Sequence, residues 1–121
     1  MSKKYKVHPI LLGEAQVGCI LDVFWSLTPD TSKVKVPIFA FLIEGGPDPI
    51  IIDAGMRSAE RAVEIHKLGP HWMPETMSLE TQLAKIGVTS EEITTCILTH
   101  LHYDHAGGCE KLPNARIVLQ R

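Results

Sequence analysis

The sequence predicts an α/β fold of the α+β kind, in which a mixed sheet is flanked by helices. Two apolar runs, Val36 to Glu44 and Ile50 to Ile52, have the composition of buried strands. Two stretches with helical apolar spacing follow, and then another short apolar run. At 121 residues, with 45% hydrophobic and 21% charged residues, the chain is long enough for one core. We therefore expect residues 1–121 to form one domain.

The first third of the chain alternates loosely between apolar and polar residues. From Tyr5 to Phe24, Gly13 and Gly18 interrupt the pattern, which predicts two short strands joined by a turn. The polar segment from Trp25 through Lys35 predicts a loop. Val36 to Glu44 is apolar almost throughout, which is typical of a strand covered on both faces.

The second predicted strand, Ile50 to Ile52, ends on the carboxylate Asp53. A carboxylate in this place has two interpretations. It can form a turn by accepting hydrogen bonds from nearby backbone amides, or it can support a metal ligand from behind. The residues alone leave both interpretations open.

Capping residues mark the predicted helices. Ser58 can cap a helix that runs to Leu68, and Ser78 can cap a second one that stops at Gly87. Between them, His71-Trp72-Met73-Pro74 is expected to be irregular, either packing over the core edge or covering a pocket. The last part of the chain predicts four further elements: a capping box at Thr89 to Glu92, a strand over Ile93 to Thr99, a short helical piece at Glu110 to Leu112, and a strand over Ala115 to Gln120.

The net charge, the lengths of the apolar runs and the number of cysteines exclude several classes of protein. The net charge is −2, and the only basic cluster is a short one near the start, so we expect no nucleic-acid partner. The apolar runs are far shorter than the ~20 residues of a membrane span, so we expect no membrane association. Three cysteines do not make a disulfide framework, which favours a reduced, cytoplasmic location. Cys19 and Cys96 are predicted core residues, while Cys109 is close enough in sequence to His105 to be an alternative metal ligand.

Residues that can bind metal ions are concentrated between Thr99 and Gly108. Three of the six histidines and one carboxylate, namely His100, His102, Asp104 and His105, occupy six positions after an apolar run. In an extended backbone, side chains two apart point the same way, so His100 and His102 can share one metal ion. A turn at Tyr103 lets Asp104 and His105 reach a second ion. Imidazole with carboxylate suits Zn²⁺ best, and Fe, Mn or Co less well.

This cluster, followed by Gly107-Gly108, resembles the signature of the metallo-β-lactamase superfamily. Ile50-Ile51-Ile52-Asp53-Ala54-Gly55 also resembles that family's earlier strand and acidic turn. Pro37 to Glu44 and Asp53-Ala54-Gly55-Met56 are similar to the N-acyl homoserine lactonase-like branch. Ala54 stands where the family more often has threonine.

The resemblance implies an αββα sandwich with a dinuclear zinc site, of which this chain is the N-terminal half. It places His100 and His102 on one metal, Asp104 and His105 on the other, and Asp53 behind them as a supporting group. Two ions with four or more ligands each need about eight contacts, and the cluster supplies four. The remaining ligands are expected from a second half.

The resemblance further implies a hydrolase of a small-molecule substrate, which opens a lactone or related ester by a metal-bridged hydroxide. This is the activity known as quorum quenching. Asp104 would be catalytic, helping to carry a proton to the leaving oxygen. Two alternatives remain. One is a superfamily enzyme for another bond, such as a thioester or β-lactam. The other is an inactive chain that needs a complementary C-terminal half or associates with itself through its uncovered sheet.

Overall fold

The computed structural model describes residues 4–19 and 30–120, and it contains one six-stranded mixed sheet. The strand order is β4-β1-β2-β3-β5-β6. The strands are β1 (Lys6–Cys19), β2 (Lys33–Glu44), β3 (Ile50–Ile52), β4 (His71–Trp72), β5 (Thr95–Leu98) and β6 (Arg116–Leu119). The helices are α2 (Ala59–His66), α3 (Leu79–Ile86) and α4 (Tyr103–Ala106), with 3-10 turns η1 (Glu75–Met77), η2 (Ser90–Glu92) and η3 (Cys109–Lys111). The predicted fold class is confirmed.

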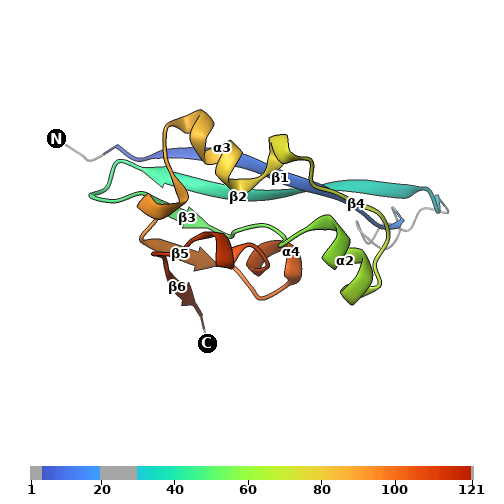
Figure 1. Ribbon diagram of the computed structural model, residues 1–121. Coiled ribbons are helices and arrows are strands. Elements are labelled where there is room, and N and C mark those ends of the chain that lie inside the picture. The colour runs from blue at the N-terminus through green and yellow to red at the C-terminus, as the bar shows by residue number, and fades with distance from the viewer. Residues whose placement is uncertain (1–3, 20–29, 121) are drawn as a thin grey trace.

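Strands β1 and β2 form a long antiparallel pair that crosses the whole molecule (Figure 1). The prediction of two short strands in this region is wrong, because the backbone stays paired through Gly13. A bulge between Leu11 and Gly13 shifts the register there. Gly13 has a φ of +156°, and a Cβ on it would lie 2.6 Å from Cε of Met56. The interruption that the glycine signals is therefore a bulge and not a turn.

The loop predicted from Trp25 through Lys35 extends too far, because β2 already begins at Lys33. Residues 20–29 and the side chain of Cys19 lie outside the described part of the chain. His71-Trp72, expected to be irregular, pairs with Glu14 and Ala15 at the sheet edge. Two residues are too short a strand for any periodicity in the sequence to predict it.

The predicted helix ends agree with the structure to within two residues. Ser58 caps α2 by accepting a hydrogen bond from the Arg61 backbone, and Ser78 caps α3 in the same way from Thr81. Gly87 ends α3 in the left-handed conformation, and the capping box at Thr89 is present. Local hydrogen bonds set these ends, which is why the sequence predicts them.

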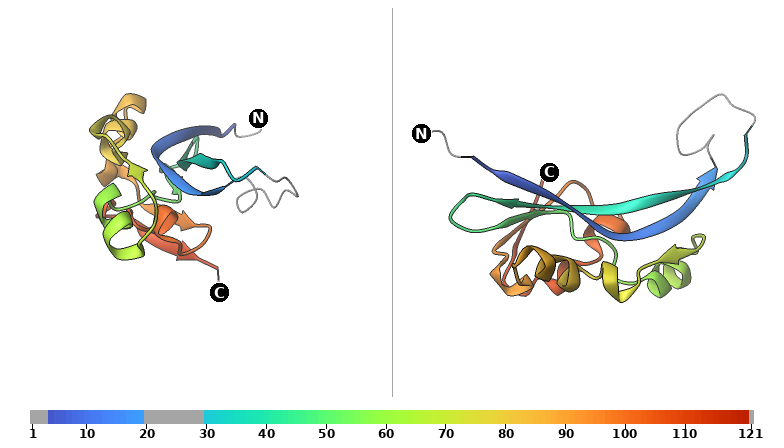
Figure 2. Two further views of the ribbon diagram at one scale, coloured as in Figure 1. Left: turned by 90° about the vertical axis from the view of Figure 1, so that its right-hand side faces the viewer. Right: turned by 90° about the horizontal axis from the view of Figure 1, so that it is seen from above.

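Helices α2 and α3 lie on the same side of the long β1–β2 pair (Figure 2). The core on that side joins alternate residues of the central strands, such as Ile10, Leu42 and Ile51, to Leu79 and Leu83 of α3. Cys96 belongs to this core and is fully buried, as predicted. Within the described residues, no helix is long and apolar enough to cross a membrane.

The opposite face of the sheet keeps large apolar side chains exposed. Phe39 and Phe41 of β2 are 36% and 38% exposed. Ala40 and Leu42, which alternate with them along the strand, are fully buried. The expectation that this strand is covered on both faces is therefore wrong for this chain. The register places Ile97 of β5 and Val118 of β6 on the same open face as Phe41, each more than a third exposed. A continuous apolar surface results, which we call the open sheet face.

Candidate metal centre

The candidate site forms where β3 and β5 end side by side. These strands are parallel, with Ile52 paired to Ile97, so their carboxyl ends meet at one edge of the sheet. Asp53 follows β3 directly, and Thr99 follows β5. The α4 turn packs against the same edge through two backbone hydrogen bonds, Ala54 N–H to His105 O (2.8 Å) and Gly108 N–H to Gly55 O (2.9 Å). Segments about 50 residues apart in sequence thereby share one small region.

Asp53 is the buried centre of this arrangement, with 3% of its surface exposed. Its Oδ1 accepts hydrogen bonds from the backbone N–H (2.9 Å) and hydroxyl (3.1 Å) of Thr99. Its Oδ2 accepts a hydrogen bond from Nδ1 of His105 at 2.8 Å. The backbone of Asp53 adopts a φ of +61°, a conformation that aspartate tolerates better than most residues. Asp53 thus does both things that the sequence left open: it binds a backbone amide and it orients a histidine.

Counting donors fixes the tautomers of two histidines. An ionised Asp53 can only accept, so Nδ1 of His105 carries the hydrogen and Nε2 keeps a lone pair in the neutral ring. The Thr99 hydroxyl donates its single hydrogen to Asp53. Nδ1 of His100 lies 3.0 Å from Oγ1 of Thr99, so in this contact Nδ1 donates and Oγ1 accepts. Both neutral rings therefore carry the lone pair that a metal needs on Nε2, and for His105 this nitrogen faces Asp104.

Three imidazoles gather at this edge. The ring centroids of His100 and His102 are 4.6 Å apart, and those of His100 and His105 are 4.1 Å apart. Asp104 lies beside them, with Oδ2 3.4 Å from Nε2 of His105. The structure therefore brings together all four residues that the sequence predicts as ligands. The turn expected at Tyr103 is the one-turn helix α4.

The donor set fits a zinc-type ion in chemistry. It combines neutral imidazole nitrogens with a carboxylate, and a buried carboxylate orients one imidazole from behind. In the described part of the chain, however, no three of the His, Cys, Asp and Glu side chains are placed so that they could hold one ion together. The division of these residues between two metals stays a prediction.

Cys109 is a poor alternative ligand in this structure. It packs against the core, and burial raises the pKa of its thiol, which disfavours the thiolate that a metal would bind.

Sequence reasoning missed two residues that shape the site. Thr99 links His100 to Asp53, and its position directly after the predicted strand was the available signal. His71 is buried, donates from Nδ1 to the Gly69 carbonyl (2.7 Å) and accepts at Nε2 from the Tyr103 hydroxyl (2.6 Å). Burial raises the pKa of Tyr103 to about 12, so its hydroxyl keeps the proton that it donates. No local sequence pattern could have shown this pairing across 32 positions.

A mixed sheet with helices on one face and a histidine-rich turn where two parallel strands end is typical of metal-binding α/β domains. The family model of the metallo-beta-lactamase superfamily matches residues 34–121, which includes every element of the site. The chain belongs to this superfamily.

Known lactonases are similar to most of the chain. The N-acyl homoserine lactonase of Bacillus cereus is 33% identical over 115 residues, which cover 85% of this chain and 45% of the relative. A solved Bacillus thuringiensis AiiA variant with N-decanoyl-L-homoserine at its active site is 28% identical, with a TM-score of 0.78. An N-acyl homoserine lactone hydrolase with N-hexanoyl-L-homoserine at its catalytic metal centre is 26% identical, with a TM-score of 0.79.

Both solved structures cover all of this chain but only 50% of their own length matches it. The chain spans about half the length of the curated relatives it matches.

Proposed function

We propose that this chain supplies the N-terminal half of the active site of a metal-dependent hydrolase that opens N-acyl homoserine lactones or related esters. The observation that carries the proposal is the network in which Asp53 orients His105 directly and His100 through Thr99. Similarity to lactonases supports the substrate class. A thioester or a β-lactam is the alternative substrate within the same superfamily.

In this proposal His100, His102, Asp104 and His105 hold two metal ions, Zn²⁺ or in its place Fe, Mn or Co, together with ligands from outside this chain. When bound, such ions would supply hydroxide at neutral pH and would polarise the substrate carbonyl. Asp53 keeps the imidazole of His105 in the tautomer that leaves Nε2 free. Asp104, whose side chain is 28% exposed, would pass a proton to the leaving oxygen in this proposal.

The proposal is tested on the chain of residues 1–121 together with a polypeptide that supplies the remaining ligands, in the presence of zinc and N-hexanoyl homoserine lactone. We expect bound zinc and lactone opening that both depend on His102. His102→Ala should lower the rate by about 100-fold or more, because one ligand is lost from an already small set. His8→Gln is the matched control, since His8 lies on β1 and pairs with Glu44 instead of joining the cluster. Equal rates for His102→Ala and the parent would refute the enzymatic proposal for this chain.

The open sheet face supports the alternative that the chain works with a second polypeptide. We propose that a complementary C-terminal half, or a second copy of this chain, covers Phe39, Phe41, Ile97 and Val118. Each of these side chains is more than a third exposed, and together they form an apolar surface of the kind that marks an interaction site.

This association is measurable by sedimentation velocity. The parent chain should sediment as oligomers, and Phe41→Lys should shift it to the monomer, because a charge on this face opposes burial. Val63→Lys on α2 is the control, since Val63 is equally exposed at 41% but lies away from the sheet face. A parent chain that is monomeric at all concentrations would contradict coverage of this face by a second copy of the chain.

A further inference from the structure

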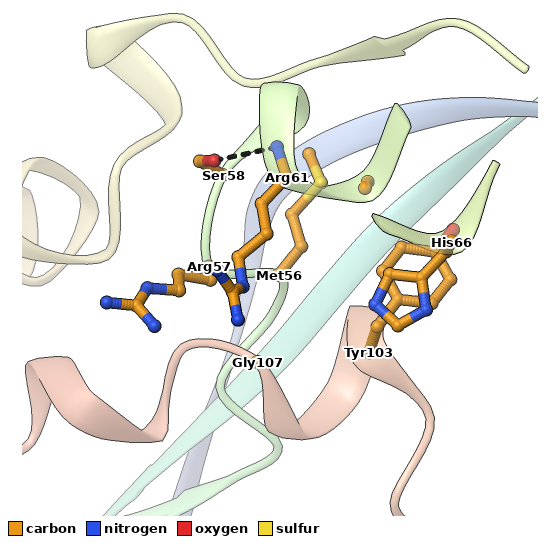
Figure 3. A pocket seen from close by; sticks show the side chains of 8 residues that line it. Met56, Arg57, Ser58, Arg61, His66, Tyr103 and Gly107 are labelled. Atoms are coloured by element: carbon orange, nitrogen blue, oxygen red, sulfur yellow. Dashed lines mark hydrogen bonds between the residues drawn. The ribbon is translucent and has the colours of Figure 1, made fainter. Parts of the chain in front are cut away.

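A pocket of about 180 Å³ lies between α2 and α4. Its walls include Arg57, Ser58, Arg61, His66 and Tyr103. Figure 3 shows the two guanidinium groups on one side of the pocket and the rings of His66 and Tyr103 on the other. Tyr103 lies on α4, the one-turn helix that also carries the predicted ligands Asp104 and His105, so one element contributes to both the pocket and the candidate centre.

The charged groups on the pocket wall are cationic. Of the described residues that line it, two are arginines and none is acidic. This positive charge is local, because the chain as a whole carries a net charge of −2. Arg57 donates from Nε to Oε1 of Glu110 at 2.7 Å, which leaves its two terminal nitrogens as donors. That ion pair is about half exposed on both sides, so it competes weakly with a ligand.

The opposite wall is flat and held in place. The rings of His66 and Tyr103 stack with centroids 4.7 Å apart and an angle of 29° between their planes. The hydroxyl of Tyr103 is engaged by buried His71, which is itself fixed by the Gly69 carbonyl. The ring therefore cannot swing into the pocket without breaking this chain of hydrogen bonds, and the space is formed before a ligand arrives.

We propose that this pocket binds a carboxylate carried by the substrate, so that the preferred substrates are lactones or esters with an anionic acyl substituent. The inference rests on the proposed function above. Planar guanidinium groups match the two oxygens of a carboxylate, and the stacked rings provide a flat surface for the group that carries it. The serine hydroxyl of Ser58 accepts from the Arg61 backbone and keeps its own hydrogen for an anion.

The first test compares two lactones of equal acyl length, one ending in a carboxylate and one in a carboxamide. Arg61→Gln should raise KM for the carboxylate substrate roughly tenfold, the loss of one charge-assisted hydrogen bond, and raise KM for the carboxamide substrate by a smaller factor. Arg57→Gln should act in the same direction and serves if Arg61→Gln does not fold. Arg116→Gln removes an exposed arginine on β6 and is the charge-matched control. Equal KM changes for both substrates would overturn the proposal.

The second test does not depend on activity. Glutarate should shift the backbone amide resonances of Tyr103 and Gly107 in the parent chain and not in Arg61→Gln. Glutarate binding without lactone opening would refute the proposed hydrolase and leave the anion site standing. No glutarate shifts would overturn the anion site whatever the chain hydrolyses. Tighter binding of inorganic phosphate than of glutarate would overturn the assignment to a carboxylate.

Discussion

Asp53→Ala is expected to lower the free energy of unfolding by about 2–4 kcal/mol, because it leaves three donors without their acceptor. These are the Thr99 backbone N–H, the Thr99 hydroxyl and Nδ1 of His105. Alanine is also less tolerant than aspartate of the φ of +61° at this position. Urea unfolding, followed by circular dichroism, measures the loss.

Asp53→Asn separates the structural role from the metal-related one. Asparagine tolerates the same backbone conformation. It has one acceptor oxygen where aspartate has two, and an NH₂ donor in place of the other. The Thr99 N–H is fixed in the backbone, so we expect the oxygen to stay with it and the NH₂ group to face His105. The amide would then donate to Nδ1 and move the imidazole hydrogen to Nε2, the nitrogen needed for a metal.

For Asp53→Asn we therefore expect stability within about 1 kcal/mol of the parent. Zinc affinity, measured against a chromophoric chelator, should fall roughly 10- to 100-fold. The ¹⁵N shifts of the His105 ring report the tautomer directly. An unchanged tautomer together with unchanged zinc affinity would show that Asp53 does not act on the candidate centre.

Gly108→Ala is the second substitution with a large expected effect. A Cβ on Gly108 would overlap the carbonyl oxygen of Ala54, which is backbone and cannot rotate away. The two segments that would have to separate are held by the hydrogen bonds between Ala54 and His105 and between Gly55 and Gly108. We expect a loss of about 3 kcal/mol in unfolding free energy, as for overpacking in a rigid core, and a displaced α4.

Gly46→Ala is the matched control for that experiment. A Cβ on Gly46 would be 3.5 Å from the nearest atom, the Asp48 carbonyl oxygen, which is an ordinary contact. Its unfolding free energy should stay within about 1 kcal/mol of the parent. If Gly108→Ala and Gly46→Ala unfold at the same urea concentration, the close approach of α4 to the end of β3 is not a constraint on the fold.

The histidine cluster and Asp53 show why part of the site could be predicted from the sequence and part could not. The cluster His100, His102, Asp104 and His105 is local, so residue types at short spacing were enough to predict candidate ligands. The link from Asp53 to Thr99 and His105 spans 46 and 52 positions. It exists only because β3 and β5 pair in parallel and bring their ends together.

By itself, the sequence determined the helix ends, the mixed α and β class, the strand over Ile50 to Ile52 and the concentration of metal-type ligands after the apolar run Cys96 to Leu98. Caps, turns and ligand clusters depend on neighbours within a few residues, so their physics can be read along the chain. Only the tertiary structure decided that Gly13 lies in a bulge of one long strand, that His71 holds Tyr103, and that one face of the sheet stays open. Those features depend on which segments meet in space, and an apolar strand has the same composition whether one of its faces is covered or both.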